Sequence, residues 1–249
     1  MFLDFNLLSY SFLVAALSAF LLGIAKAGVK GIAALIVTGF AIVYGAKEST
    51  GILMPLLICG DIFAVLYYKR YVKWIYILKL IPWMIFGVLI GVVIGSNISE
   101  KIFQYGMALI IIFSVSVMYY WDSKKNNGIP NNFIFAPSIG VLAGFATMIG
   151  NLAGALSNIY FLAMRLPKNE FIGTSAWLFF IINVFKIPFH IFFWETITLK
   201  SLIISSKLVP FVIIGLLIGV FVVKKIENEN YRKLILILTA IGGIGILFK

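Results

Sequence analysis

The chain has 249 residues, of which 62% are hydrophobic and 12% are charged, and its formal net charge is +11. A soluble domain is about half apolar and about a quarter charged. The composition therefore excludes a soluble domain, a disordered chain, a disulfide scaffold and a nucleic-acid-binding protein, and it predicts an all-α polytopic membrane protein. One cysteine, Cys59, and one histidine, His190, are too few for a disulfide framework or a multi-ligand metal site, so we expect no metal and no cofactor.

Ten apolar segments follow one another along the chain, and each is expected to be a helix in the lipid bilayer. The first has no basic region before it, so we expect a retained helix and not a cleaved signal peptide. A polar linker at 122–132 divides one transmembrane domain, 1–249, into two parts, 1–121 and 133–249. The predicted segments are 7–24, 31–45, 50–68, 74–95, 102–121, 133–149, 153–165, 171–193, 199–223 and 231–248.

The two parts are related in sequence. KLIPWMIFGVLIGV at 79–92 and KLVPFVIIGLLIGV at 207–220 share nine of fourteen positions at a fixed offset of 128 residues. This similarity indicates an internal repeat of five segments. Because five is odd, the second repeat is expected to be inverted relative to the first.

The distribution of charge agrees with inversion. The loops at 69–73 and 224–225 are basic, whereas their counterparts in the other repeat carry fewer basic residues, and the linker between the repeats is basic at 124–125. Since Lys and Arg concentrate in cytoplasmic loops, these three loops are expected inside and both ends of the chain outside.

Two pairs of neighbouring segments are short and are joined by small residues. The first hairpin turns through GIAKAGVKG at 23–31, which contains Gly28, and the second through GNLAG at 150–154, which contains Asn151 and Gly154. Two interpretations stay open. The turns are ordinary short connections, or they are re-entrant hairpins that meet near the midplane and offer the N–H groups of a following helix to an anion. In the second case a side chain at Gly28 or Gly154 is expected to block the anion.

Ionisable residues inside a membrane are costly and usually functional. Asp61 is the one acid placed well inside a segment, whereas five lysines lie deep or at the hairpins: Lys26, Lys30, Lys79, Lys186 and Lys207. This imbalance favours an anionic cargo. Lys79 and Lys207 are expected to extend to the interface, and a cytoplasmic loop is the alternative for Lys26 and Lys30. Asp61 is expected either to pair with a lysine or to carry a coupling proton.

The segment 171–193 carries Asn183, Lys186 and His190 at positions i, i+3 and i+7, which lie on one stripe of a helix. Pro188 removes one backbone donor from this helix and is expected to bend it. An amide, an amine and an imidazole on one face suit an oxyanion. The alternative for His190 is a purely structural role.

Three stretches carry a resemblance to a known family. They are GIAKAGVKG in the first hairpin, GDIFAVLYYKR at 60–70, and GNLAGALSNIYFLAMRLPKNEFIGTSAWLFFIINVFKIPFH at 150–190, the most specific of the three. The chain resembles, over nearly its whole length, the sulfite exporter TauE/SafE family, also called the toluene sulfonate uptake permeases. The resemblance implies an internally duplicated membrane protein that moves sulfite, or a sulfonate such as sulfoacetate, across the inner membrane.

The residues and the resemblance together predict a secondary transporter, not an enzyme, that exports a small sulfur oxyanion across the cell inner membrane. The alternatives are a transporter or channel for another small anion, or a non-transporting membrane assembly subunit. The exact substrate, the coupling and the oligomeric state, including a homo-oligomer, stay open. The expected binding residues comprise three lysines, two glycines and six donors, with Asp61 as the coupling residue: Lys26, Gly28, Lys30, Asn151, Gly154, Ser157, Asn158, Thr174, Asn183, Lys186 and His190.

Overall fold

The computed structural model describes residues 10–96, 98–123, 134–231, 233–235 and 237–238. Within these residues the structure is helical and contains no strand. Residues 228–231, 233–235 and 237–238, which lie just before and within the last predicted segment, are also helical. The remaining elements are α1 (Tyr10–Ala27), α2 (Ala33–Tyr44), α3 (Ala46–Tyr68), the 3₁₀ helix η1 (Lys69–Tyr71), α4 (Trp74–Ser96), α5 (Glu100–Ser123), α6 (Phe135–Gly150), α7 (Ala153–Ala163), α8 (Lys168–Phe192) and α9 (Leu199–Lys225).

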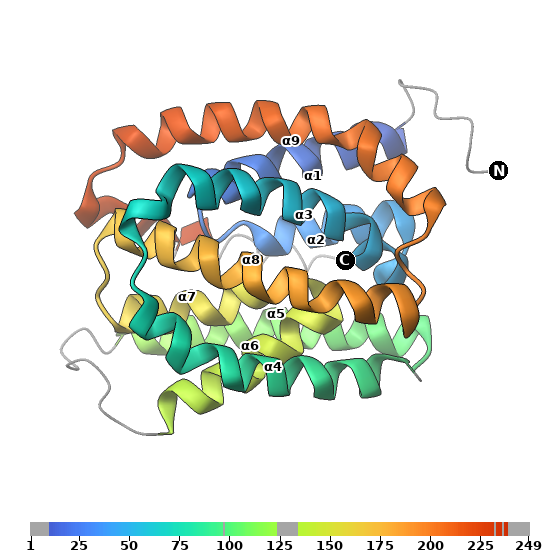
Figure 1. Ribbon diagram of the computed structural model, residues 1–249, viewed down its shortest axis with the longest axis horizontal. Helices are drawn as coiled ribbons and strands as arrows, with labels where there is room; N and C mark the ends of the chain where they lie inside the picture. Colours follow the sequence, from blue (N-terminus) through green and yellow to red (C-terminus); the bar gives the residue numbers. More distant parts are fainter. Residues whose placement is uncertain (1–9, 97, 124–133, 232, 236, 239–249) are drawn as a thin grey trace.

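The helices lie roughly along one common axis, the long axis of the molecule (Figure 1). Five of the described helices, α1, α3, α4, α8 and α9, are long and apolar enough to cross a membrane. The outer faces of α4, α5 and α9 expose large apolar side chains such as Leu78, Leu109 and Leu217. Exposed apolar surface on this scale is unfavourable in water and favourable in lipid. The predicted all-α polytopic membrane fold is confirmed.

Two helices, α2 and α7, are too short to cross a bilayer. Their 12 and 11 residues correspond to about 18 and 17 Å of helix, against a hydrocarbon core about 30 Å thick. Each follows a longer partner, α1 or α6, in a helical hairpin. The first residues of α2 and α7 are buried or half-buried.

Helices from the two parts of the chain pack in corresponding pairs. α1 packs along α9, α4 packs along α6, and α3 packs on α8. A Cβ atom at Gly87 of α4 would lie 2.1 Å from the carbonyl oxygen of Val141, and one at Gly215 of α9 would lie 2.1 Å from that of Phe20. Gly87 and Gly215 are the matching glycines of the sequence repeat, so the repeat corresponds to equivalent helix contacts. The inverted orientation of the two parts stays a prediction.

The start of α3 differs from the sequence prediction. The helix begins at Ala46 and not at residue 50. Gly45 ends α2 with φ +88°, a conformation that favours glycine, and the carboxylate of Glu100 accepts hydrogen bonds from the backbone N–H groups of Ala46 and Lys47. An acidic group at a helix N-terminus satisfies free N–H groups and interacts favourably with the helix dipole. Glu100 is 54 residues away in the chain, so the local sequence does not reveal this cap.

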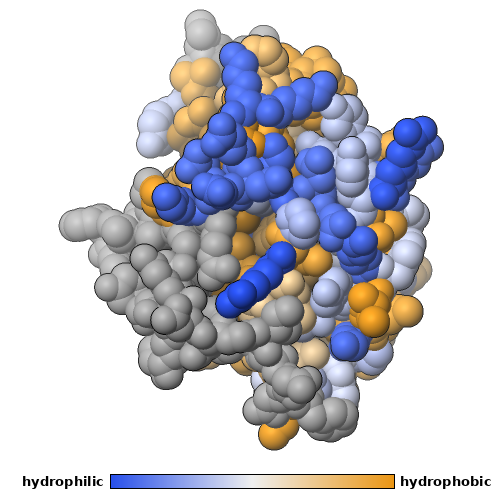
Figure 2. Space-filling model, turned by 90° about the vertical axis from the view of Figure 1, so that its left-hand side faces the viewer, coloured by the Kyte–Doolittle hydropathy of each residue, from blue (hydrophilic) through white to orange (hydrophobic). Residues whose placement is uncertain are grey.

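At one end of the bundle, at the left in Figure 1, α3 and α9 end and α4 and α8 begin. Figure 2 looks onto this end and shows a largely hydrophilic face. Its exposed basic residues include Lys69, Arg70, Lys73, Lys224 and Lys225. Lys124 and Lys125, which were expected at the same end, lie outside the described residues.

Candidate anion-binding site

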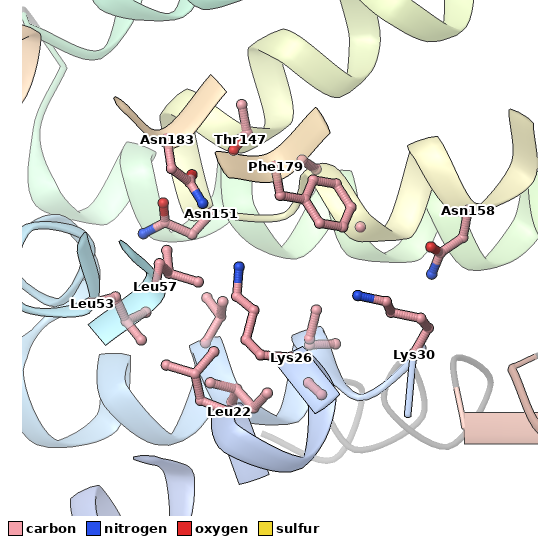
Figure 3. Close-up of a pocket in the computed structure, with 18 residues that line it drawn as sticks. Leu22, Lys26, Lys30, Leu53, Leu57, Thr147, Asn151, Asn158, Phe179 and Asn183 are labelled. Atoms are coloured by element: carbon pink, nitrogen blue, oxygen red, sulfur yellow. The ribbon is translucent and has the colours of Figure 1, made fainter. Parts of the chain in front are cut away.

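A cavity lies where the two hairpins approach each other inside the bundle (Figure 3). It holds about 780 Å³ of empty space, with the open solvent at its mouth included. The ends of α1 and α6 and the starts of α2 and α7 line it, and α3 and α8 contribute further walls. Lys26 and Asn151, 125 positions apart in the sequence, line this same cavity.

Lys26 and Lys30 bring two ammonium groups to the cavity. Both side chains are largely buried, with 6% of each residue exposed. Their Nζ atoms lie 5.6 and 5.3 Å from the centre of the Phe179 ring, and ammonium groups are attracted to the face of an aromatic ring. The first hairpin is therefore part of the protein interior and not a solvated loop.

Amide side chains line the cavity opposite these lysines. Figure 3 shows Asn151, Asn158 and Asn183 on the other side of the space from Lys26 and Lys30. The Oδ1 atom of Asn158 is buried and has no hydrogen-bond partner among the described residues. A buried polar atom without a partner is costly, so this amide oxygen needs a hydrogen-bond donor. The amide can interact with an anion only through its Nδ2 group.

The N-termini of both short helices open onto the same cavity. Ala33 and Ala34 begin α2, Ala153 and Gly154 begin α7, and all four line the space. Neither helix has a side-chain hydrogen bond at its N-cap, because Ile32 and Leu152 occupy the N-cap positions. The first N–H groups of a helix have no partner within the helix and attract anions.

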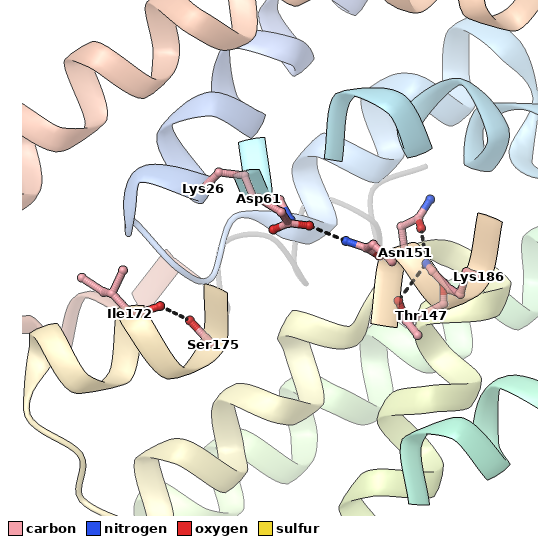
Figure 4. Close-up of polar contacts among 8 residues, drawn as sticks. Lys26, Asp61, Thr147, Asn151, Ile172, Ser175 and Lys186 are labelled. Carbon is pink, nitrogen blue, oxygen red and sulfur yellow. Dashed lines mark hydrogen bonds and ion pairs between the residues drawn. The ribbon is translucent and has the colours of Figure 1, made fainter. Parts of the chain in front are cut away.

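Asp61 joins α1 to α8 behind the cavity (Figure 4). Its side chain is fully buried, and its Oδ1 atom lies 2.5 Å from Nζ of Lys26. Its Oδ2 atom accepts a hydrogen bond of 2.7 Å from the Nδ2 atom of Asn183. Of the lysines that the sequence left open as partners, the structure selects Lys26.

Lys186 holds the second hairpin. Its fully buried ammonium group donates to the carbonyl oxygen and Oγ1 of Thr147, at 2.9 and 3.0 Å, and to Oδ1 of Asn151, at 2.7 Å (Figure 4). Asn151 in turn donates to the carbonyl oxygen of Thr50 in α3. Lys186 does not line the cavity, but it fixes two residues that do.

Besides Lys186, four of the expected binding residues do not line this cavity. Ser157 donates to the carbonyl oxygen of Ala153 in its own helix, and Thr174 accepts from the backbone N–H of Lys73 near η1. The Nδ1 atom of His190 lies 2.8 Å from Oγ1 of Thr196. Gly28 packs between helices, where a Cβ atom would lie 2.8 Å from Ile172.

The two hairpin glycines differ in the space around them. Gly28 has φ +128°, a conformation that L side chains rarely adopt, and its surroundings are crowded. A Cβ atom at Gly154 would meet only the Cζ atom of Phe179, at 3.9 Å. The expectation that neither position has room for a side chain therefore applies to Gly28, whereas a longer side chain at Gly154 would extend into the cavity.

Comparison with known proteins identifies the family of the chain. The chain matches the family described as sulfite exporter TauE/SafE over residues 12–246. The chain belongs to the TauE/SafE family. It is therefore a membrane transporter of sulfur anions and not an enzyme. No curated protein and no solved structure matches the chain.

Among the lining residues that the sequence prediction did not include, Thr147 and Phe179 contact a lysine. Thr147 lies one helical turn before Asn151 on α6, and this spacing could have indicated it. Phe179 lies one turn before Asn183 on α8 in the same way, but an aromatic residue in an apolar segment gives no separate signal.

Proposed function

We propose that this TauE/SafE protein is a secondary transporter that exports sulfite, or an organosulfonate such as sulfoacetate, across the inner membrane. The observation that carries the proposal is the placement of Lys26 and Lys30 in one buried cavity with three amide side chains. A small oxyanion needs positive charge and many hydrogen-bond donors. The two uncapped helix N-termini add backbone donors to the same space.

Flux into proteoliposomes tests the proposal. The purified chain is reconstituted, and uptake of radiolabelled sulfite is followed in anaerobic buffer to prevent oxidation. We expect saturable uptake that Lys30→Met lowers at least tenfold, because the variant removes a charge from the cavity. Lys79→Met is the matched control, since it removes a charge from an exposed position on α4. Equal uptake in empty vesicles, or equal loss in both variants, would contradict the proposal.

The same vesicles distinguish a carrier from the alternatives. A carrier shows faster uptake of labelled sulfite when unlabelled sulfite is present inside the vesicles, because the loaded site returns more readily than the empty one. A channel for small anions shows no such acceleration and gives a measurable conductance. A non-transporting assembly subunit shows neither.

The proposed orientation places the basic end of the bundle in the cytoplasm. The exposed lysines and Arg70 at that end (Figure 2) support it through the positive-inside rule. In a Cys59→Ala background, a cysteine at residue 200 is expected to react with an impermeant reagent added outside intact cells. A cysteine at residue 225 is expected to react only after the membrane is opened. The reverse pattern would overturn the orientation and, with it, the proposed direction of export.

Asp61 is the coupling residue in this proposal. When Lys26 turns to a bound anion, the carboxylate loses its positive partner and becomes a favourable site for a proton. Uptake by the wild-type protein is then expected to respond to an imposed pH gradient, and uptake by Asp61→Asn is expected not to. If Asp61→Asn responds to the gradient as the wild type does, Asp61 serves only as the ion-pair partner of Lys26.

A further inference from the structure

The heavy-atom contacts of the buried groups match particular charge states. Both oxygens of Asp61 accept hydrogen bonds, one from Lys26 and one from Asn183, which is the pattern of an ionised carboxylate. Lys186 donates to three oxygen atoms, which is the pattern of a protonated ammonium group with three N–H donors. The ammonium group of Lys30 lies over the Phe179 ring, as a cation does.

His190 adds no charge to this cluster. Its Nε2 atom is buried and has no partner among the described residues, while Nδ1 is paired with Thr196. An imidazolium ion has two N–H donors and would leave one of them unsatisfied, so the neutral ring fits these contacts. Among the described residues, Asp61 is the single buried carboxylate. Three ammonium groups and this carboxylate give the site a net charge of +2.

We infer that the site selects doubly charged anions over singly charged anions of the same shape, an inference that rests on the proposed function. Removing an anion from water costs about four times as much for a dianion as for a monoanion of equal size, since the Born energy scales with the square of the charge. A site with a net charge of +2 attracts a dianion twice as strongly as a monoanion. Of the two anions, only the dianion leaves the occupied site with no net buried charge. A monoanion would leave a buried charge of +1. For sulfite, the bound form is the dianion and not bisulfite.

The selectivity does not depend on the role of Asp61 in coupling. With Asp61 ionised the site carries +2, and with Asp61 protonated it carries +3. Both values favour the dianion. Lys186 contributes one positive charge to the site although it does not line the cavity. Its charge therefore acts on an anion at a distance and through Thr147 and Asn151, which it positions.

Two anions of similar shape that do not titrate near neutral pH provide the test. Sulfate is a dianion, and methanesulfonate is a monoanion in which a methyl group replaces one oxygen. Each competes with radiolabelled sulfite for uptake into proteoliposomes. We expect sulfate to inhibit at lower concentration than methanesulfonate.

A charge-neutralising variant gives the sharper result. The Coulomb energy is proportional to the charge of the anion. We therefore expect Lys186→Met to raise the inhibition constant of sulfate by the square of the factor by which it raises that of methanesulfonate, for example about a hundredfold against about tenfold. Lys79→Met is expected to leave both inhibition constants unchanged. If Lys186→Met does not elute as a single folded species, Lys30→Met provides the same ratio, since its ammonium group has no hydrogen bond to another described residue that the substitution would remove.

The outcomes separate the inference from the proposed function. Absence of sulfite uptake by the wild type contradicts the proposed function. If the wild type takes up sulfite, any of three results overturns the inference alone. Methanesulfonate inhibits uptake as well as sulfate does, Lys186→Met raises both inhibition constants by the same factor, or neither anion inhibits uptake. The inference is supported if Lys186→Met or Lys30→Met raises the inhibition constant of sulfate by the square of the factor for methanesulfonate, and if Lys79→Met leaves both inhibition constants unchanged.

Discussion

Replacing Asp61 with asparagine removes the negative partner of Lys26 at a position where water cannot take its place. The Asp61 side chain is fully buried and that of Lys26 is 8% exposed, with 2.5 Å between the paired atoms. Removing one partner of a buried ion pair costs about 3–5 kcal/mol, because the other charge stays buried without compensation. For a chain of this size, that free energy corresponds to a fall in melting temperature of about 6–20 °C.

The assay is thermal unfolding of the purified protein in detergent, and a double variant isolates the interaction. Asp61→Asn combined with Lys26→Met leaves no unpaired charge, so we expect it to melt well above Asp61→Asn. The control is Glu170→Gln, which breaks the ion pair of Glu170 with Lys73 at 3.1 Å, where the side chains are 29% and 47% exposed. Exposed pairs contribute about 0–1 kcal/mol, so this variant is expected to melt close to the wild type. The reasoning is refuted if Asp61→Asn melts like Glu170→Gln, or if the double variant melts below Asp61→Asn.

Glycine substitutions test the packing and the hairpins. Gly87→Ala and Gly215→Ala each place a Cβ atom 2.1 Å from a backbone carbonyl oxygen, so we expect a low yield of monodisperse protein on size exclusion. Gly106→Ala meets nothing within 4 Å and is expected to gain up to about 1 kcal/mol in stability, and a normal yield from all three would contradict the packing argument. Gly28→Ala is expected to destabilise the protein because of its φ of +128°, measured as a lower melting temperature. Gly154→Leu is expected to fold and to lose sulfite uptake, and uptake at the wild-type rate would show that the anion does not pass Gly154.

The sequence predicted many of the residues and both hairpins that form the cavity, but few of the contacts between them. Charge inside apolar segments identified Lys26, Lys30, Lys186 and Asp61, because such residues are rare in a membrane without a function. Glycine-rich turns identified the two hairpins. Helical spacing placed Asn183 with Lys186, and both are buried on the face of α8 that points into the bundle.

Other parts of the site depend on contacts between distant residues. Ser157 and Asn158 are neighbours in sequence, but only Asn158 lines the cavity, while the Ser157 hydroxyl bonds within its own helix. Thr174 is buried on α8 like Asn183, but it meets the backbone near η1. Composition shows that these groups are polar, and it does not show which side of a helix meets the cavity.

The sequence by itself predicted a multi-pass membrane protein, which is confirmed, and it indicated an internal repeat and an excess of positive charge inside apolar segments. Those properties depend on composition and on short-range spacing, which the chain carries without folding. Only the tertiary structure decided that Asp61 pairs with Lys26, that Lys186 holds the second hairpin, and that two uncapped helix N-termini open onto one cavity. These contacts join residues that are 35 or more positions apart. They form only when the helices pack, because packing alone determines which buried charges come within hydrogen-bond distance.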